Sequence, residues 1–302
     1  IQYAMQIIMS FLMITAMSIM LPRANVAALR INDVLKTKVS VIDPENPVQP
    51  DANVKGTVEF DHVSFAYPEA GENVLTDISF KAEKGETIAV IGSTGSGKST
   101  LINLIPRFYD VTEGQVMVDG MDVREYKITD LRDKIGIVPQ KAVLFAGTVR
   151  SNLAWGKEDA TEEEMQQALS VAQAAEVVDK KDGKLDAEVE QGGKNFSGGQ
   201  KQRLTIARAL VKQPEILIMD DSSSALDYAT DAKLRQAIHN MPNRPTVFIV
   251  SQRAASIMYA DKIIVLDDGT VAGTGTHEEL LKDCSVYQEI YYSQFKRTEG
   301  GH

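Results

Sequence analysis

An apolar run opens the chain: residues 1–21, IQYAMQIIMSFLMITAMSIML, contain no charged side chain. A helix of this length, at 1.5 Å per residue, is about 30 Å long and matches the hydrocarbon thickness of a bilayer. No basic stretch precedes the run and no small-residue cleavage site follows it, so it differs from a secretory signal. We therefore expect a transmembrane helix. The alternative is a buried amphipathic helix of a soluble domain.

The next stretch, residues 22–53, is first basic and then rich in turn-forming residues. Its excess of positive charge predicts that this end of the apolar helix lies on the cytosolic side. The pattern allows the helix to continue as far as Val41, whereas residues 43–56, DPENPVQPDANVKG, have three prolines and no apolar period, which is typical of a linker. Because the sequence begins without Met, we expect a fragment of a longer protein. The charged residues before the linker are Arg23, Arg30, Asp33, Lys36 and Lys38.

Beyond residue 56 the pattern changes to alternating strands and helices. Residues 57–67, TVEFDHVSFAY, alternate apolar and polar positions as a half-buried strand does. A capping box, Thr161 with Glu164, predicts a helix start, and Asp268-Gly269 predicts a hairpin. Continuous apolar runs alternating with helical stretches predict an α/β domain whose mostly parallel sheet is covered on both faces. The apolar runs are 88–91, 216–219 and 246–250, and the helical stretches are 98–108, 161–175 and 230–240.

Composition narrows the class of protein without identifying it. Of the 302 residues, 43% are hydrophobic and 25% charged, which is ordinary for a globular protein and excludes wholesale disorder. The net charge of −10 argues against nucleic acid as a partner. The single cysteine, Cys284, has no internal disulfide partner, so we expect a small buried side chain in a reducing cytosolic environment.

The most specific motif is the glycine-rich loop GSTGSGKST, which follows the apolar run 88–91 and satisfies G-x-x-x-x-G-K-[ST]. Its glycines let main-chain N–H groups turn toward phosphate oxygens, and the following helix adds its positive end. Lys98 supplies a cation for the β and γ phosphates, and the Ser99 hydroxyl can ligate Mg²⁺. The alternative is a flexible loop. The residues predicted to bind nucleoside triphosphate are Gly92, Ser93, Thr94, Gly95, Ser96, Gly97, Lys98, Ser99 and Thr100.

Two further motifs point to the same chemistry. In ILIMDD, residues 216–221, an apolar strand ends at Asp220, which we expect to hold Mg²⁺ beside the glycine-rich loop. In NFSGGQKQR, residues 195–203, an exposed serine and two glycines open a helix and form a second anion cradle. Two cradles on one chain suggest a nucleotide clamped between two domains. The second cradle is made of Ser197, Gly198, Gly199 and Gln200.

These motifs together resemble the nucleotide-binding domain of an ABC transporter over roughly residues 54–295. The resemblance implies that Tyr67 stacks on adenine, that Gln140 contacts Mg²⁺ and senses the membrane domain, and that residues 224–227, SALD, cross a dimer interface. It implies ATP and Mg²⁺ as cofactors. The implied fold is an ABC-type P-loop domain, residues 54–302, with an antiparallel β subdomain and a helical signature subdomain near 141–210. Stretches 107–126 and 144–156 look specifically like exporters, with residues 1–21 as the last membrane helix.

The resemblance also implies a head-to-tail dimer, in which residues 197–200 contact the partner's ATP. Two positions depart from the family pattern. Asp221 stands where the family usually has a glutamate general base. Its side chain has one methylene less than glutamate, which shortens its reach by about 1.5 Å, whereas a general base must lie within about 3 Å of the proton that it takes. Gln252 stands where a histidine usually reaches the γ-phosphate, and it cannot carry that positive charge. Together they favour a degenerate ATP site.

We therefore expect one half of a heterodimeric exporter in the plasma membrane, with its nucleotide-binding domain in the cytosol. Its partners would be membrane lipid, an exported drug or lipid-like molecule, and a second half-transporter carrying Glu and His at the positions of Asp221 and Gln252. One alternative is a homodimer with two slow working sites. Another is a non-transport ABC ATPase, against which the apolar segment 1–21 argues.

Overall fold

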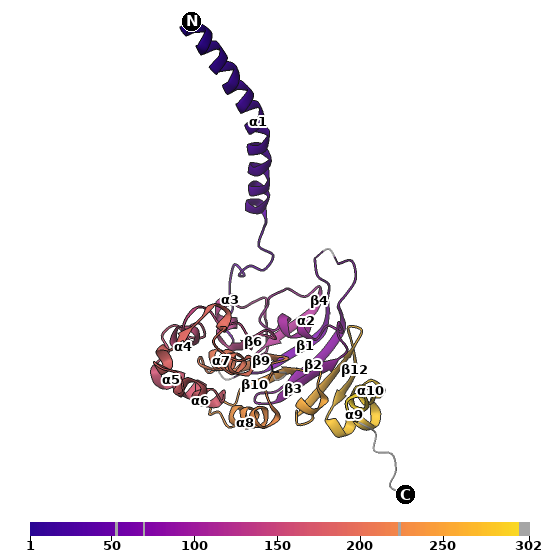
Figure 1. The fold of residues 1–302 in the computed structure, drawn as a ribbon. Helices are drawn as coiled ribbons and strands as arrows, with labels where there is room; N and C mark the ends of the chain where they lie inside the picture. The colour runs from indigo at the N-terminus through magenta and orange to yellow at the C-terminus, as the bar shows by residue number, and fades with distance from the viewer. Residues whose placement is uncertain (52–53, 69, 223–224, 296–302) are drawn as a thin grey trace. The chain divides into compact units, whose positions relative to one another are not determined.

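The computed structural model describes residues 1–51, 54–68, 70–222 and 225–295, and its chain forms two units, residues 1–42 and 43–302. The first unit is the helix α1, Gln2–Lys36, with Pro22 inside it and no buried residue (Figure 1). Within the described ranges it is the one helix long and apolar enough to cross a membrane. It ends at Lys36, short of the limit at Val41 that the sequence pattern allowed.

The centre of the second unit is a six-stranded sheet in the order β12-β11-β3-β10-β9-β6. All neighbouring strands are parallel except β11 and β12, which form the predicted hairpin. Its turn residues Asp268 and Gly269 have φ of 42° and 75°, the left-handed pair that a two-residue hairpin turn requires. The strands are β3 Thr87–Gly92, β6 Ile135–Val138, β9 Ile216–Asp220, β10 Thr246–Val250, β11 Lys262–Asp267 and β12 Thr270–Gly275.

A second, antiparallel sheet has the order β2-β1-β4-β5. Successive residues of β3 divide the interior between two apolar cores, as the period of a strand dictates. Ile88 and Val90 join the core shared with the antiparallel sheet, whereas Ala89 and Ile91 join the core beneath the helices. The predicted α/β fold, with a parallel sheet covered on both faces and an antiparallel subdomain, is confirmed. The strands are β1 Val58–Phe65, β2 Leu75–Ala82, β4 Glu113–Val118 and β5 Met121–Asp122.

Apart from α2 and α3, the helices of the second unit form two sets. Helices α4, α5 and α6 gather around α7, next to the edge strand β6 (Figure 1). Helices α8, α9 and α10 follow later strands. The bounds are α2 Lys98–Leu104, α3 Ile128–Asp133, α4 Val149–Ala154, α5 Glu162–Val171, α6 Ala175–Asp179, α7 Gly198–Leu210, α8 Tyr228–His239, α9 His277–Asp283 and α10 Ser285–Gln294, with the short pair β7 Gly147–Thr148 and β8 Glu188–Val189.

Local chemistry accounts for where two of the predicted helices begin and end. Thr161 and Glu164 form the expected reciprocal capping box at the start of α5. Helix α2 stops at Leu104, four residues before the predicted end at Phe108. Pro106 has no N–H to continue the helical ladder, and Arg107 turns into the left-handed region with φ of 51°. The buried Arg107 guanidinium then pairs with Asp110 at 2.7 Å.

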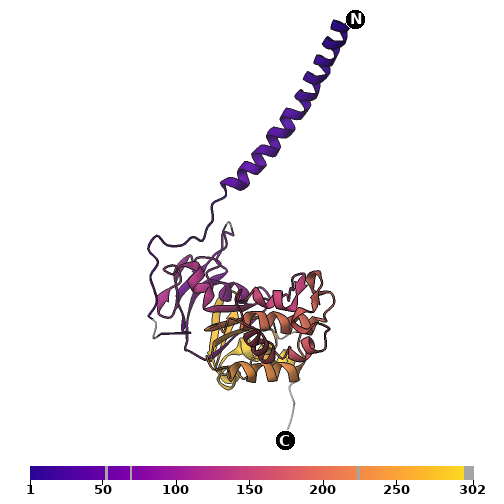
Figure 2. The same cartoon turned by 90° about the vertical axis from the view of Figure 1, so that its left-hand side faces the viewer.

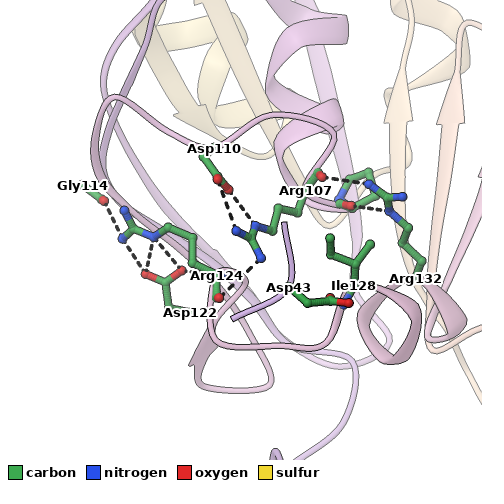
Figure 3. Close-up of polar contacts among 9 residues, drawn as sticks. Asp43, Arg107, Asp110, Gly114, Asp122, Arg124, Ile128 and Arg132 are labelled. Carbon is green, nitrogen blue, oxygen red and sulfur yellow. Dashed lines mark hydrogen bonds and ion pairs between the residues drawn. The ribbon is translucent and has the colours of Figure 1, made fainter. Parts of the chain in front are cut away.

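The linker is fastened to the second unit at its first residue. Asp43 Oδ1 accepts a hydrogen bond from the Ile128 N–H at 2.7 Å, which caps the first turn of α3 (Figure 3). Further along, the Val48 N–H donates to the Glu125 carbonyl at 3.0 Å. The linker therefore lies along the chain that leads into α3.

Helix α3 is in turn attached to the end of the glycine-loop helix. Arg132 donates to the carbonyls of Pro106 and Arg107 at 3.1 and 3.0 Å, and Arg107 donates to the Arg124 carbonyl at 3.4 Å (Figure 3). Side chains thus connect the linker, α3 and the end of α2 in one polar cluster. Figure 2 shows the same elements from a perpendicular direction, with the antiparallel sheet beside the helices.

Candidate nucleotide-binding site

The parallel register gathers the predicted site at one edge of the sheet. Val250 on β10 pairs with Asp220 on β9 and with Val90 on β3, so the loops after these three strands begin side by side. A cavity of about 260 Å³ lies at this edge. It brings together the glycine-rich loop, the two acids that end ILIMDD, Gln140 and Gln252; the predicted residues that line it are Thr94, Gly95, Gly97, Lys98, Ser99, Thr100, Gln140, Asp220, Asp221 and Gln252.

The glycine-rich loop is tight enough to demand glycine at two positions. Gly97 has φ of 93°, and a Cβ there would lie 2.7 Å from the Leu75 side chain. A Cβ on Gly92 would lie 2.2 Å from the Leu266 carbonyl oxygen. The chain therefore passes where no larger residue fits, and the start of α2 faces the cavity with its free N–H groups.

Lys98 is folded back onto this loop. Its ammonium group donates to the carbonyls of Gly92 and Ser93 at 3.0 and 2.5 Å, with the Ser96 hydroxyl at 3.4 Å. The residue is 7% exposed, and burial lowers the pKa of the ammonium, while the charges of Asp220 and Asp221 oppose that shift. When a triphosphate binds, its charged oxygens would take the place of these neutral carbonyls as acceptors for the Lys98 ammonium, and hydrogen bonds to charged acceptors are stronger.

Ser99 and Asp220 form the pair suited to magnesium. The Ser99 hydroxyl donates to Asp220 Oδ1 at 3.1 Å, although the two residues lie 121 positions apart. Burial raises the Asp220 pKa, and the Ser99 hydrogen bond opposes the rise. The described chain has no cluster of three or more His, Cys, Asp or Glu residues for a metal ion. A single carboxylate beside a hydroxyl suits Mg²⁺, which is commonly held by one or two carboxylates together with substrate phosphates and water.

Asp221 sits on an unusual backbone at the far end of β9. Its φ is 43°, and its N–H donates to the Val250 carbonyl at 2.9 Å. Burial raises the pKa of this carboxyl, and the charge of Arg253, a hydrogen bond from Gln140 and the charge of Lys98 oppose the rise. Gln140, predicted to touch Mg²⁺, therefore contacts the candidate base directly in this structure.

The remaining predicted residues lie around this centre. Gln252 lines the cavity from the loop after β10. Tyr67 hydrogen-bonds through its hydroxyl to Thr100 Oγ1 at 2.9 Å, and its ring meets that of Tyr109 edge-on at 5.2 Å. An aromatic ring therefore lies beside the glycine-rich loop, and its stacking on adenine stays a prediction.

The second anion cradle lies at the start of α7. Ser197 caps this helix in a reciprocal pair with Gln200, and none of residues 197–200 lines the cavity of the glycine-rich loop. A Cβ on Gly198 would meet nothing within 4 Å, and one on Gly199 would lie 3.2 Å from the Ala225 carbonyl. Residue 224, in the predicted interface loop, lies outside the described residues.

Sequence reasoning missed a groove on the helical side of the domain. It has a volume of about 360 Å³ and is lined by three exposed aromatic rings and three cations: Phe108, Phe145, Trp155, Arg132, Arg208 and Lys212. Burial lowers the pKa of Arg208, whose Nη1 is buried and, among the described residues, has no hydrogen-bond partner. The aromatic rings come from separate loops, so no periodic pattern marks them.

Comparison with known proteins now identifies the domain. Residues 75–224 match the family described as ABC transporter. This chain contains an ATP-binding domain of the ABC transporter family. ABC ATPase domains bind ATP with Mg²⁺, and the Ser99 hydroxyl and the Asp220 carboxylate at the cavity are oxygen groups that suit both.

Relatives match nearly the whole chain. An uncharacterized ABC transporter ATP-binding protein of Mycobacterium tuberculosis is 49% identical over 99% of this chain and 52% of its own length. A putative multidrug export ATP-binding/permease protein of Bacillus subtilis is 42% identical over 83% of this chain and 43% of its own. The solved structure of a bacterial Atm1-family ABC exporter with ATP bound has a TM-score of 0.84 at 33% identity, covering 92% of this chain and 48% of that one. The chain spans about half the length of these relatives.

The geometry predicts that Lys98→Ala weakens ATP binding by about a hundredfold, because the phosphates lose charge-assisted hydrogen bonds worth about 1.5–3 kcal/mol. An equilibrium titration with labelled ATP measures the effect, and circular dichroism checks that the fold persists. Lys84→Ala, which removes an exposed lysine outside the cavity, is the matched control. Parental affinity in Lys98→Ala would contradict the assignment of this loop.

Proposed function

We propose that the chain is part of one half of a heterodimeric membrane exporter, which uses ATP binding and hydrolysis to move a drug or lipid-like molecule across the plasma membrane. The observation that carries this proposal is the separation of two anion cradles within one domain. The cavity at Lys98 contains none of residues 197–200, although these form an exposed helix N-terminus with open space at Gly198. We infer that a nucleotide held by the first cradle meets the Ser197–Gln200 cradle of a second domain.

The likeness to exporters supports a head-to-tail arrangement of two such domains. Each ATP would lie between the glycine-rich loop of one chain and the Ser197–Gln200 cradle of the other. The glycines of that cradle fit this role, because Gly198 leaves room for a phosphate to approach the main-chain N–H groups. The relatives named as multidrug export proteins favour export over a non-transport ATPase.

The membrane assignment rests on α1. The helix is exposed along its whole length, and its apolar first part precedes a basic stretch. A soluble domain would bury such an apolar surface, whereas a bilayer solvates it. We propose that residues 1–21, which include the apolar first part of α1, are the last transmembrane helix of a membrane domain, with residues 22–53 as a cytosolic extension and linker and residues 54–302 as the nucleotide-binding domain in the cytosol.

Asp221 and Gln252 support a degenerate site on this chain. Asp221 is held by its main chain at the end of β9, so its shorter side chain is not compensated by a freely moving backbone. A general base must come within about 3 Å of the water proton, and a misplacement of about 1 Å can cost a hundredfold in rate. Gln252 offers a neutral amide at the position where a protonated imidazole would stabilise the negative charge of the γ-phosphate. The partner half would supply the competent site, with Glu and His at these positions.

The aromatic groove is the proposed contact with the membrane domain. Phe108, Phe145 and Trp155 are 42%, 46% and 71% exposed, and a cluster of exposed aromatic rings is typical of a contact surface. A short apolar segment with acidic or helix-terminal carbonyl groups would fill the groove and satisfy its cations. The groove also borders the loop from Gln140 to Phe145, and Gln140 contacts Asp221. A displacement of Phe145 in the groove would therefore be transmitted along this loop to Gln140 and from there to Asp221.

The first test separates the two cradles. Ser197→Arg should reduce the steady-state ATPase rate of the assembled dimer far more than Asp221→Asn does, because the cradle completes the partner's competent site. Thr276→Arg is the matched control, since Thr276 caps α9 by the same reciprocal pair, with Glu279. If Asp221→Asn abolished turnover and Ser197→Arg left it intact, the roles of the two sites would be reversed.

The second test restores the site. The double change Asp221→Glu with Gln252→His should raise hydrolysis at this chain's own site about tenfold or more, and each single change should do less, because base and γ-phosphate contact act together. The measurement is ATP trapped after a single turnover, with the partner's base disabled. Equal clearance by the parent and the double variant would favour the homodimer with two working sites.

The third test concerns the groove. Trp155→Ala should lower substrate-stimulated ATPase and transport in the full-length dimer about tenfold, while ATP affinity stays at the parental value, because Trp155 lines no part of the ATP cavity. Trp155→Phe keeps an aromatic ring and should restore most of the coupling. Unchanged transport with Trp155→Ala would exclude this groove as the docking surface.

A further inference from the structure

The loop that carries Gln252 has little structure of its own. It leaves β10 at Val250, passes Ser251 to Arg253, and enters a single turn of helix at Ala254–Ser256. Within the loop, the Arg253 N–H donates to Ser251 Oγ at 3.0 Å. Both Gln252 and Arg253 are exposed, whereas Ala254 is fully buried. Contacts from outside the loop therefore decide where the Gln252 side chain lies.

One side chain from the last helix supplies such contacts. The Gln294 carboxamide donates from Nε2 to the Gln252 carbonyl at 2.7 Å and accepts at Oε1 from the Ala254 N–H at 2.9 Å. The two hydrogen bonds lie on either side of Arg253 and join residues 40 or more positions apart. A single planar amide thus holds the loop at two main-chain points.

Helix α10 presents Gln294 from a fixed position. Tyr287, in its first turn, has no exposed surface, and its hydroxyl hydrogen-bonds to His277 Nδ1 at 2.8 Å on α9. Cys284, at the start of the helix, is buried against β12, with Sγ 3.8 Å from the Ala272 carbonyl. The N-terminal half of α10 is therefore anchored in the core, and its last residue reaches the loop.

We propose that Gln294 is a positioning residue for the ATP site, which fixes the loop so that the Gln252 amide points at the terminal phosphate. The inference rests on the proposed role of Gln252 at the γ-phosphate. It explains how a neutral amide serves at this position: with its main chain held at both sides, Gln252 loses little conformational freedom on binding. Gln294 does not line the ATP cavity and acts only through the loop.

The chemistry of the contact requires an amide. Glutamate has the same shape but no N–H, so it loses the bond to the Gln252 carbonyl and sets two acceptors face to face. Alanine loses both bonds and leaves the Ala254 N–H without its partner in a buried position. Both changes should release the loop without altering the residues that contact the α and β phosphates.

The test compares ATP and ADP, since only ATP has the phosphate that the loop would meet. Equilibrium titrations on the full chain in detergent give the ratio of the two dissociation constants. Gln294→Glu and Gln294→Ala should reduce the preference for ATP over ADP by about ten- to a hundredfold, the value of one hydrogen bond to a charged group, and should leave ADP affinity unchanged. In a Gln252→Ala background, Gln294→Glu should have no further effect.

Gln288→Ala is the matched control. Gln288 lies on the same helix and donates two hydrogen bonds from Nε2, to the carbonyls of Leu281 and Lys282, away from the loop. An equal fall in the ATP preference with this control would overturn the proposal, because general loosening of α10 would then be the cause. A parental ratio in stable Gln294 variants would overturn it too. If the parent protein showed no preference for ATP over ADP, that result would instead contradict the proposed contact of Gln252 with the γ-phosphate and the function proposed for this ATP site.

Discussion

The parallel pairing of β3, β10 and β9 is the constraint on which the site depends. β3 lies more than a hundred residues before β9 and β10 in the chain, yet all three strands end at the same edge, with Val250 in register with both Val90 and Asp220. The glycine-rich loop, the acid pair and the Gln252 loop start from these ends. A shift of one residue in either pairing would reverse the side on which each side chain lies and would separate Ser99 from Asp220.

The same edge concentrates charge in a partly buried place. Burial lowers the pKa of Lys98 and raises those of Asp220 and Asp221, while their opposite charges act against each shift. In the structure the lysine is satisfied by loop carbonyls and one acid by Ser99. Triphosphate and Mg²⁺ would bring one anion for the lysine and one cation for the acids, so binding replaces partial contacts with full charge pairing.

The sequence predicted the parts of the site that are encoded locally. Three features were predicted because the residues that determine their conformation are neighbours in the sequence. They are the loop at Gly92 to Thr100, the apolar run before Asp220 and the capping box at Thr161. The contacts between distant segments had no such signal. Asp43 caps α3 from 85 positions away, and Gln294 holds a loop 40 or more positions earlier, each with a common polar side chain. The groove escaped for the same reason, because its rings come from separate loops.

The exposed indole of Trp155 can serve as a fluorescent reporter of the groove. The chain has a single tryptophan, and that residue is 71% exposed at the rim of the groove. Indole emission depends on how much water surrounds the ring, and the tryptophan fluorescence of this chain, excited selectively from its nine tyrosines, comes from one known place. A change in its emission maximum or its quenching by a dissolved solute would report occupancy of the groove without any attached dye, and separately from events at the ATP cavity.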